Sequence, residues 1–313
     1  MKKEKVVIAL GGNALGNNKK EQILALENAA SSIVDLIEEG IDLVITHGNG
    51  PQVGMIQTAM DELSLKMPSY GKIPLTSSVA MSQGYIGMDL ENAIRRQLSK
   101  RDIDKEVTTV LTQVEVLEDD KAFKNPSKPI GRFMDKAEAE KLEKDGFNLI
   151  EDSGRGYRIV VASPTPKKIV ELKAIDNLLK AGHVVIACGG GGIPVINKDG
   201  NLNEVDAVID KDNTSSLLAR GLDADKLIIL TAVEKVAINF GKTNEKWLDT
   251  LTIDQAKTYI EEGQFGKGSM EPKVAASLDF VNNTRGKEAL ITELKKVKEA
   301  LAGKTGTRIS NGD

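Results

Sequence analysis

Three apolar segments of the sequence end in glycine clusters. The clusters are Gly11-Gly12-Asn13, Gly48-Asn49-Gly50 and Gly189-Gly190-Gly191-Gly192. Glycine allows the backbone to approach an anion closely, so that backbone N–H groups can point at phosphate oxygens. Each cluster alone is equally compatible with a tight turn between a strand and a helix. Together, with Asn13 and Asn49 as side-chain donors, they favour one shared anion site.

Lysine and aspartate residues stand near the starts of two predicted helices. Lys211 lies between Asp210 and Asp212, and Lys273 follows Pro272, which suits the first turn of a helix. Phosphoryl transfer requires two groups held in line and charge neutralised on the moving phosphoryl, which lysines and a metal ion can do. These residues therefore favour phosphoryl chemistry. The alternative is a solvated helix start with Asp212 as its N-cap.

Several other kinds of site are excluded by the motifs and residue types. No Gly-x4-Gly-Lys-Ser/Thr sequence is present, and residues 48–54 lack the dinucleotide spacing, so neither a P-loop nor an ordinary NAD site is predicted. One cysteine, Cys188, and two histidines, His47 and His183, cannot form a disulfide framework or a His/Cys zinc site within one chain. We expect His47 to be a structural hydrogen-bonding residue rather than a general base.

Composition limits the partners and the compartment. The 313 residues are 40% hydrophobic and 28% charged, which is typical of a globular protein that buries a large core. The net charge of −4 lacks the basic excess that nucleic-acid binding requires. No apolar stretch approaches the roughly 18 residues of a membrane span, and the apolar run at the N-terminus is too short for a secretory signal. We expect a cytoplasmic protein without a membrane segment.

Alternating strands and helices must position these residues. The apolar pattern predicts strands at 5–10, 42–46, 106–111, 183–188, 226–230 and 287–291, and helices at 19–39, 51–66, 76–99, 167–181, 212–221, 252–262 and 272–283. Successive strand, helix and strand form βαβ units, so we predict an α/β fold with a parallel sheet. Ligands of such sheets bind outside the carboxyl ends of the strands, where the glycine clusters stand. Two α/β lobes or one continuous sheet with two halves both fit.

Residues 121–156 differ in composition and interrupt this alternation. The segment has few apolar runs and places Lys124, Lys128 and Arg132 among prolines, on a stiffened loop that could fold over a substrate. Taken alone, it is typical of a charged surface loop. Where the chain returns from this segment to the predicted sheet, it carries Arg155 and Arg158. These arginines suit either bidentate binding of carboxylate or phosphate, or ion pairs with neighbouring acidic residues.

These motifs, in order along nearly the whole chain, resemble those of carbamate kinases in the amino-acid kinase family. They are Ala9 to Ala14, His47 to Gly54, Phe123 to Gly131, Cys188 to Pro194 and Ala207 to Asp212. Many amino-acid kinases have a lysine two residues before the first Gly-Gly, where this chain has Ala9. In carbamate kinases a lysine of the protruding subdomain replaces that charge, and Lys128 matches it. The combination argues against an acetylglutamate kinase.

The resemblance implies a three-layer α/β/α sandwich with a mainly parallel eight-stranded sheet. Residues 1–313 would form one domain, with a lid subdomain protruding at about 121–156. It also implies reversible Mg²⁺-dependent phosphoryl transfer between carbamoyl phosphate with ADP and carbamate with ATP. We expect the ATP-forming direction of arginine fermentation, a homodimer, and no nucleic-acid or membrane partner. Another small-acid kinase, a relative that chiefly synthesises carbamoyl phosphate and a non-catalytic metabolite sensor are the alternatives.

The resemblance also assigns roles to particular residues. The catalytic residues would be Lys128, Lys211, Asp212 and Lys273, with Asp212 holding the last two lysines in place. Carbamate or the transferring phosphoryl would bind at Gly11, Gly12, Asn13, Gly48, Asn49 and Gly50. Nucleotide would bind at Gly190, Gly191, Asp210 and Met270, as MgATP or MgADP, and no residue is assigned as a metal ligand. Four positions depart from the usual pattern, Arg132, Ser153, Tyr157 and Ala162, and leave the behaviour of the lid unpredicted.

Overall fold

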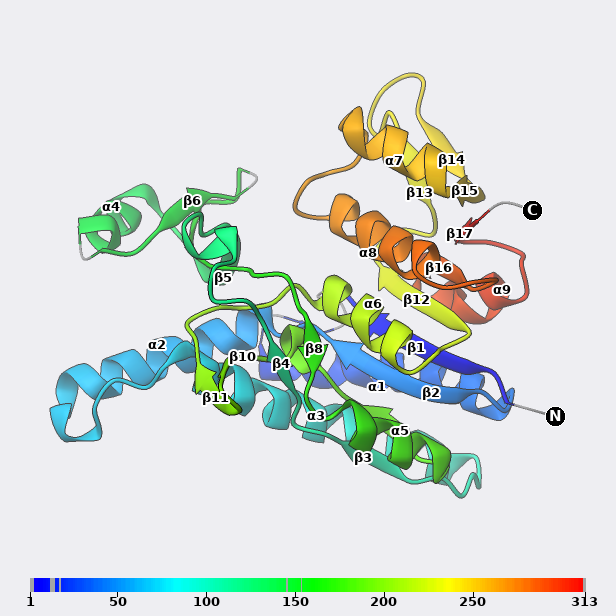
Figure 1. Cartoon of the computed structure of the whole chain (residues 1–313), viewed down its shortest axis with the longest axis horizontal. Helices are drawn as coiled ribbons and strands as arrows, with labels where there is room; N and C mark the ends of the chain where they lie inside the picture. Colours follow the sequence, from blue (N-terminus) through cyan, green and yellow to red (C-terminus); the bar gives the residue numbers. More distant parts are fainter. Residues whose placement is uncertain (1–2, 12–14, 17, 145, 153, 312–313) are drawn as a thin grey trace.

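An eight-stranded sheet forms the centre of the computed structural model (Figure 1), which describes residues 3–11, 15–16, 18–144, 146–152 and 154–311. Its strand order is β15-β17-β16-β12-β1-β2-β9-β3. The strands are β1 (Lys5–Leu10), β2 (Asp42–His47), β3 (Val107–Thr109), β9 (Val184–Ile186), β12 (Lys226–Thr231), β15 (Thr250–Thr252), β16 (Glu288–Glu293) and β17 (Thr307–Ser310). Every pair is parallel except β16 with β17. The predicted mainly parallel sheet is confirmed.

Helices cover both faces of this sheet. They are α1 (Lys19–Glu38), α3 (Leu75–Lys100), α5 (Leu172–Lys180), α6 (Lys211–Gly221), α7 (Ile253–Glu261), α8 (Met270–Asn282) and α9 (Val297–Leu301). The helix α2 (Gly50–Lys66) packs on α3 and extends beyond the sheet (Figure 1). Alternate residues of β1 enter different cores: Val6 and Ile8 pack with α1, α3 and α9, whereas Val7 and Ala9 pack with α5, α6 and α8. Because successive strand residues point to opposite faces, this division gives the three predicted layers.

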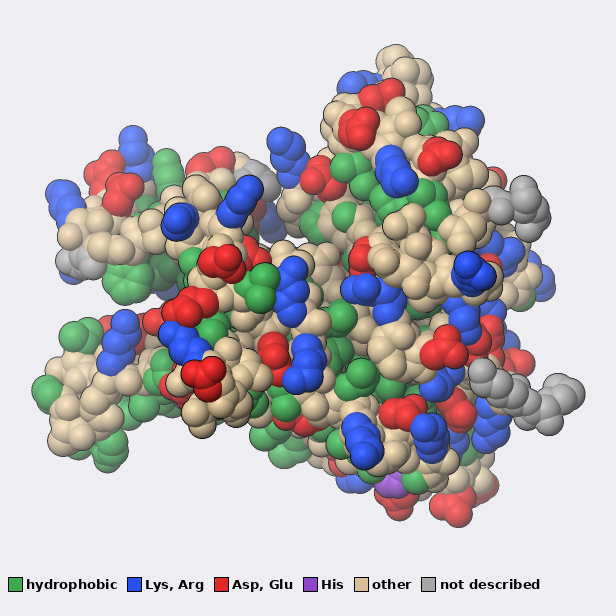
Figure 2. Space-filling view, in the orientation of Figure 1, with side chains coloured by type: hydrophobic (Ala, Val, Ile, Leu, Met, Phe, Trp, Pro, Cys, Tyr) green, Lys and Arg blue, Asp and Glu red, His purple; other side chains and the backbone are tan. Residues whose placement is uncertain are grey.

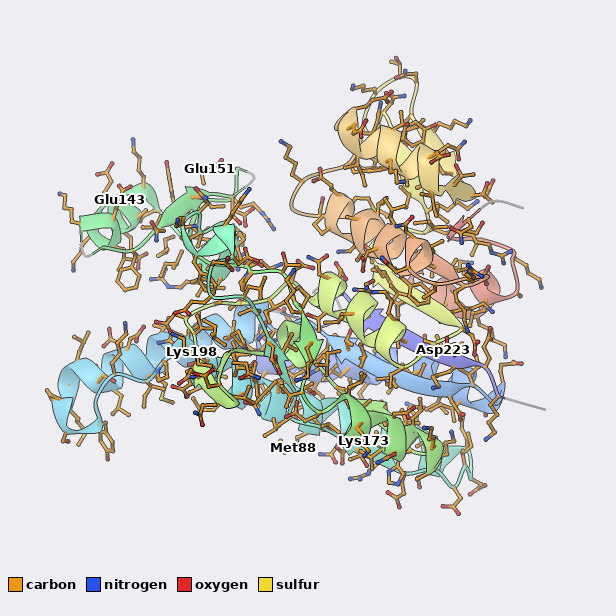
Figure 3. The ribbon with its side chains drawn as sticks, in the orientation of Figure 1. Met88, Glu143, Glu151, Lys173, Lys198 and Asp223 are labelled. Atoms are coloured by element: carbon orange, nitrogen blue, oxygen red, sulfur yellow. The ribbon has the colours of Figure 1, made fainter. Side chains whose placement is uncertain are left out.

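The segment after η3 (Lys121–Phe123) leaves the sheet and forms a small antiparallel sheet of its own. This lid has the strand order β5-β7-β6 and the helix α4 (Lys136–Lys144). Its strands are β5 (Lys128–Met134), β6 (Leu149–Glu151) and β7 (Tyr157–Val161). A notch separates the outer lid from the outer part of α2 (Figure 2), and a cavity of about 340 Å³ is lined by both. Glu143 and Glu151 lie on the lid's outer side (Figure 3).

The lid and α2 approach each other closely at two glycines. A Cβ on Gly54 of α2 would lie 2.1 Å from the Cα of Gly131 in β5, and Gly131 has φ +70°. Only residues without a Cβ allow the helix and strand backbones to approach this closely. At this point the distance between lid and body is therefore set by backbone rather than by side chains.

Short elements complete the fold and differ from the predicted pattern. A second sheet has the order β11-β10-β4-β8, with strands β4 (Gln113–Glu115), β8 (Lys168–Ile169), β10 (Ile193–Lys198) and β11 (Asn201–Glu204), and the hairpin β13 (Val236–Ile238) and β14 (Lys246–Leu248) lies apart. Three further short helices are η2 (Pro68–Tyr70), η4 (Gly189–Gly191) and η5 (Leu294–Lys296). The helix predicted at 167–181 begins only at Leu172, because Lys168 and Ile169 pair with β4.

On the face seen in Figure 2, no large area is covered by cationic side chains alone. Lysine and arginine side chains alternate with aspartate and glutamate over the face seen in Figure 2. Within the described ranges, no helix is both long and apolar enough to cross a membrane.

Candidate active site

The three glycine clusters follow β1, β2 and β9, which are neighbours in the central sheet. Because these strands are parallel, their carboxyl ends lie at one edge and bring the clusters together. Gly11 lies against β12, where an added Cβ would be 2.6 Å from the carbonyl oxygen of Leu230. Gly12 and Asn13 fall outside the described residues. The described clusters therefore meet at the edge where the sequence places an anion site.

The third cluster packs against the second. Gly190 has φ +66°, and a Cβ there would lie 2.1 Å from Nδ2 of Asn49. The same Nδ2 donates a hydrogen bond to Oγ of Ser82 at 2.9 Å, and Asn49 is buried. A Cβ on Gly191 would lie 2.2 Å from the carbonyl oxygen of Ile209. These glycines thus make room for the Asn49 amide and for the chain that enters α6.

His47 is a neutral residue at the end of β2. Its Nδ1 lies 2.8 Å from the carbonyl oxygen of Gly48, so Nδ1 carries the proton. Burial lowers the pKa of His47 to about 4, against the opposing effect of this hydrogen bond, and Lys211 lowers it further. The ring is therefore uncharged near pH 7 and fixes the backbone of the second cluster, in agreement with the structural role expected for it.

Asp212 joins the lysines of two helices. Its Oδ1 accepts a hydrogen bond from Nζ of Lys211 at 2.5 Å, and its Oδ2 accepts one from Nζ of Lys273 in α8 at 3.1 Å. Burial alone would raise the pKa of Asp212, but the two ammonium groups outweigh it and hold this pKa below its usual range. Two cations on one carboxylate leave a positive charge at the start of α6, where the helix dipole also favours an anion.

Asp210, rather than Asp212, is the N-cap of α6. Its Oδ1 accepts hydrogen bonds from the backbone N–H of Asp212 at 2.8 Å and of Asn213 at 3.4 Å. Its Oδ2 accepts a hydrogen bond from Nζ of Lys128 at 2.5 Å. The alternative in which Asp212 caps a solvated helix is therefore wrong, because Asp212 is buried and already engaged by two lysines.

The cations of the lid have different environments. Lys128 is the first residue of β5 and not part of a loop, so the loop prediction is wrong for it. Arg155 and Arg158 both contact Asp152, at 3.2 and 3.3 Å, and the guanidinium of Arg158 also donates to the carbonyl oxygen of Gly131. Of the two open readings for these arginines, the structure favours the ion pairs.

A cavity of about 530 Å³ opens beside the lysine cluster. Gly11 and Lys273 line it together with Met270, so it borders both the first glycine cluster and the cluster around Asp212. Its other lining residues include the aromatic side chains Phe240, Trp247 and Phe265. Phe240 and Trp247 meet edge to face with ring centroids 6.1 Å apart. The volume and the mixed apolar and cationic lining suit a ligand of nucleotide size.

Of the residues predicted to bind nucleotide, Met270 lines this cavity. Gly190, Gly191 and Asp210 lie instead at the glycine clusters and the start of α6, and their role toward nucleotide stays a prediction. The aromatic lining was missed. One signal was available, since the single tryptophan of the chain, Trp247, stands in a polar stretch close to Phe240. Among the described residues, no group of three or more His, Cys, Asp or Glu could hold a metal ion.

Comparisons with known proteins agree in sequence and in structure. The family model described as the amino acid kinase family matches residues 4–293. The carbamate kinase-like protein YqeA of Escherichia coli is 55% identical over 306 residues, which cover 98% of this chain and 99% of that protein. Carbamate kinase 2 of Staphylococcus epidermidis is 51% identical over 309 residues, with the same coverage. The carbamate kinase from Giardia lamblia bound to AMP-PNP superposes with a TM-score of 0.89, at 40% identity and 98% coverage of each chain.

Proposed function

This chain belongs to the amino acid kinase family and is a phosphotransferase of the carbamate kinase group, and from that premise we propose that it moves a phosphoryl group reversibly between carbamoyl phosphate and ADP. In the forward reaction the bond from phosphorus to the carbamoyl oxygen breaks. A bond from phosphorus to the terminal oxygen of ADP forms, and carbamate leaves. The observation that carries the proposal is the pairing of Asp212 with Lys211 and Lys273 beside both the glycine clusters and the cavity.

ADP would occupy the 530 Å³ cavity, with its base among the aromatic side chains and its phosphates toward Lys273 and Gly11. Aromatic rings provide apolar surface for a base, and lysines provide charge for phosphates. The relative from Giardia lamblia was solved with AMP-PNP, which supports a nucleotide in this fold. Met270, which the sequence predicts to bind nucleotide, also lines this cavity.

Carbamoyl phosphate would bind at the glycine clusters, through Gly11, Gly12, Asn13, Gly48, Asn49 and Gly50. Backbone N–H groups would hold its phosphoryl oxygens, while Lys211 and Lys273 neutralise the charge that spreads over the moving phosphoryl. Asp212 keeps both lysines in place. Lys128 supplies a third cation from the lid. Little proton transfer is needed, which agrees with a neutral, structural His47.

We propose that Mg²⁺ accompanies the nucleotide. Mg²⁺ in kinase sites takes one or two carboxylates and keeps several waters, so the nucleotide phosphates would hold most of it. The carboxylates at this edge, Asp210 and Asp212, both bond to lysines, which leaves the phosphates as the main ligands. When bound, the ion would neutralise phosphate charge.

The physiological direction and assembly are further parts of the proposal. We propose ATP formation in arginine fermentation, in the cytoplasm, with carbamate decomposing to ammonia and carbon dioxide. A homodimer is supported by large apolar side chains exposed on α1, α2 and α3, and α3 packs against each of the other two helices. These side chains include Ile23, Leu24, Met55, Met81 and Met88. Light scattering on the purified chain tests the dimer, and a monomer at micromolar concentration would contradict it.

The decisive experiment is ATP formation from ADP, Mg²⁺ and carbamoyl phosphate in a coupled assay. Acetyl phosphate and acetylglutamyl phosphate are the comparison donors, and Lys211→Ala is the control for contaminating kinases. We expect rapid turnover with carbamoyl phosphate alone. A folded chain that binds ADP but gives no turnover would refute the proposal and favour another small-acid substrate.

A further inference from the structure

The backbone fixes Lys128 next to the segment that carries Asp210. Lys128 pairs in register with Val161 of β7. The next residue, Ala162, forms a parallel bridge with Ala207, and the N–H of Val208 donates to the carbonyl oxygen of Ala162 at 3.0 Å. These backbone hydrogen bonds join the base of the lid to the chain just before α6. Lys128 therefore belongs to the anchored base of the lid, whereas residues such as Glu143 lie on its outer side (Figure 3).

The two oxygens of Asp210 have separate partners. Oδ1 accepts from the first backbone N–H groups of α6, which fixes the orientation of the carboxylate. Oδ2 is left to face Lys128, and the two charged atoms lie 2.5 Å apart. The Lys128 side chain is 34% exposed and the Asp210 side chain 17% exposed, so the pair remains within reach of a ligand. A helix cap thus serves as a rigid support for a lysine from another part of the chain.

We propose that Asp210 is a positioning residue, which holds the ammonium group of Lys128 at the start of α6 before carbamoyl phosphate binds. The proposal rests on the proposed function, in which Lys128 neutralises the transferring phosphoryl. A free lysine has four flexible carbon–carbon bonds, so ordering its side chain costs conformational entropy. Without Asp210, that cost would add to the barrier of each reaction cycle. Restraining it beforehand leaves only a short exchange of partners, from the Asp210 carboxylate to phosphoryl oxygens.

The test is a double-mutant cycle of Asp210→Asn and Lys128→Ala, with kcat and the KM values for ADP and carbamoyl phosphate. Asparagine caps a helix as well as aspartate, so α6 keeps its cap while the negative charge is lost. We expect Lys128→Ala to lower kcat by about 10²–10³-fold, as loss of one stabilising donor does. We expect Asp210→Asn to lower kcat by about 10–10²-fold, as a misplaced group does, with the KM for ADP unchanged. The double variant should equal Lys128→Ala alone.

Two results would overturn the proposal. Losses that multiply in the double variant would show that Asp210 acts without Lys128. A raised KM for MgADP with kcat preserved would make Asp210 a nucleotide or metal contact instead. Burial lowers the pKa of Lys211, and the charge of Asp210 opposes this shift, so the four proteins are compared over a pH series. If Asp210→Asn acts through Lys211, it should shift the fall of kcat at high pH whether residue 128 is lysine or alanine. If it acts through Lys128, it should change kcat only in the proteins that keep Lys128.

A second double-mutant cycle measures the contact between Lys128 and Asp210 through stability, without an activity assay. Urea unfolding of the same four proteins should show coupling between positions 128 and 210, and additive unfolding energies would overturn the pairing. Glu138→Gln, which breaks the lid's own ion pair with Arg132, is the matched control and should leave kcat unchanged. A wild-type chain without carbamoyl phosphate turnover would refute the proposed function, while the unfolding cycle would still decide whether Asp210 holds Lys128.

Discussion

Two carboxylates at the start of α6 hold lysines in different ways. Asp212 is 3% exposed and binds Lys211 and Lys273, both from helices that pack on the central sheet. Asp210 binds Lys128, which comes from the lid and remains one-third exposed. An ion pair near solvent is screened and exchanges partners at low cost, whereas a buried cluster is expensive to open. Folding itself therefore sets the central cluster, while the lid contact is one that a bound phosphate can replace.

Asp212→Ala should disrupt the buried lysine cluster and have the largest effect of the variants considered. Two nearly buried lysines would lose their shared carboxylate, so we expect the free energy of unfolding to fall by about 3–5 kcal/mol, with kcat largely lost. Urea unfolding and the coupled assay measure the two effects. Asp249→Ala, which removes the exposed partner of Lys235, is the control and should change stability by less than about 1 kcal/mol. Equal losses in the two variants would contradict a special role for the buried cluster.

Lys211→Ala and Lys273→Ala should each lower kcat by about 10²–10³-fold, because their charge matters most as the phosphoryl moves. The KM for ADP should change much less. Trp247→Ala provides the opposite case, since loss of an aromatic wall of the cavity should raise the KM for ADP about tenfold and preserve kcat. If the lysine variants weaken nucleotide binding as much as they lower kcat, their assignment to the transition state is wrong.

The acid limb of stability should report on His47 in the central region. Its pKa falls from 6.5 to about 4 on folding, chiefly through burial, so the unfolded chain binds the proton more strongly. The stabilisation is complete above pH 6.5 and is lost as the pH falls from 6.5 toward 4. In wild type, His47 should lower the free energy of unfolding by about 3 kcal/mol over this pH range, and His47→Asn should abolish that decrease. Urea midpoints across that range test it, with His183→Asn as the control, and identical acid slopes in wild type and His47→Asn would refute it.

Gly54→Ala should have the smallest effect, and it tests the contact between the lid and α2. The added Cβ would meet the backbone of Gly131, which cannot move out of the way as a side chain can. We expect a loss of about 1–3 kcal/mol, a lower kcat and an unchanged KM for ADP. Gly84→Ala in α3, where no atom lies near the new Cβ, is the control and should be neutral or stabilising. A normal kcat in Gly54→Ala would mean that the close contact between the lid and α2 does not affect phosphoryl transfer.

The sequence by itself determined six strands of the central sheet, most of the long helices and the reaction class, whereas β15 and β17 were not predicted. Apolar runs and glycines after β1, β2 and β9 are local signals, because strand burial and close anion approach act on neighbouring residues. The order of motifs along the chain was specific enough to indicate the family that the comparisons show. Lys211, Asp212 and Lys273 were also recognised from their local sequence and lie together.

Tertiary structure alone decided how distant residues share the site. Lys128 and Asp210 are 82 positions apart, and their pairing depends on the register of the lid strands with the segment before α6. The choice of Asp210 as N-cap and the packing of Gly190 against Asn49 depend on side-chain geometry that composition does not encode. The aromatic cavity likewise collects Phe240, Trp247 and Phe265 from separate segments. Hydrophobic periodicity reports which face of an element is buried, whereas only the folded chain decides which residues that face meets.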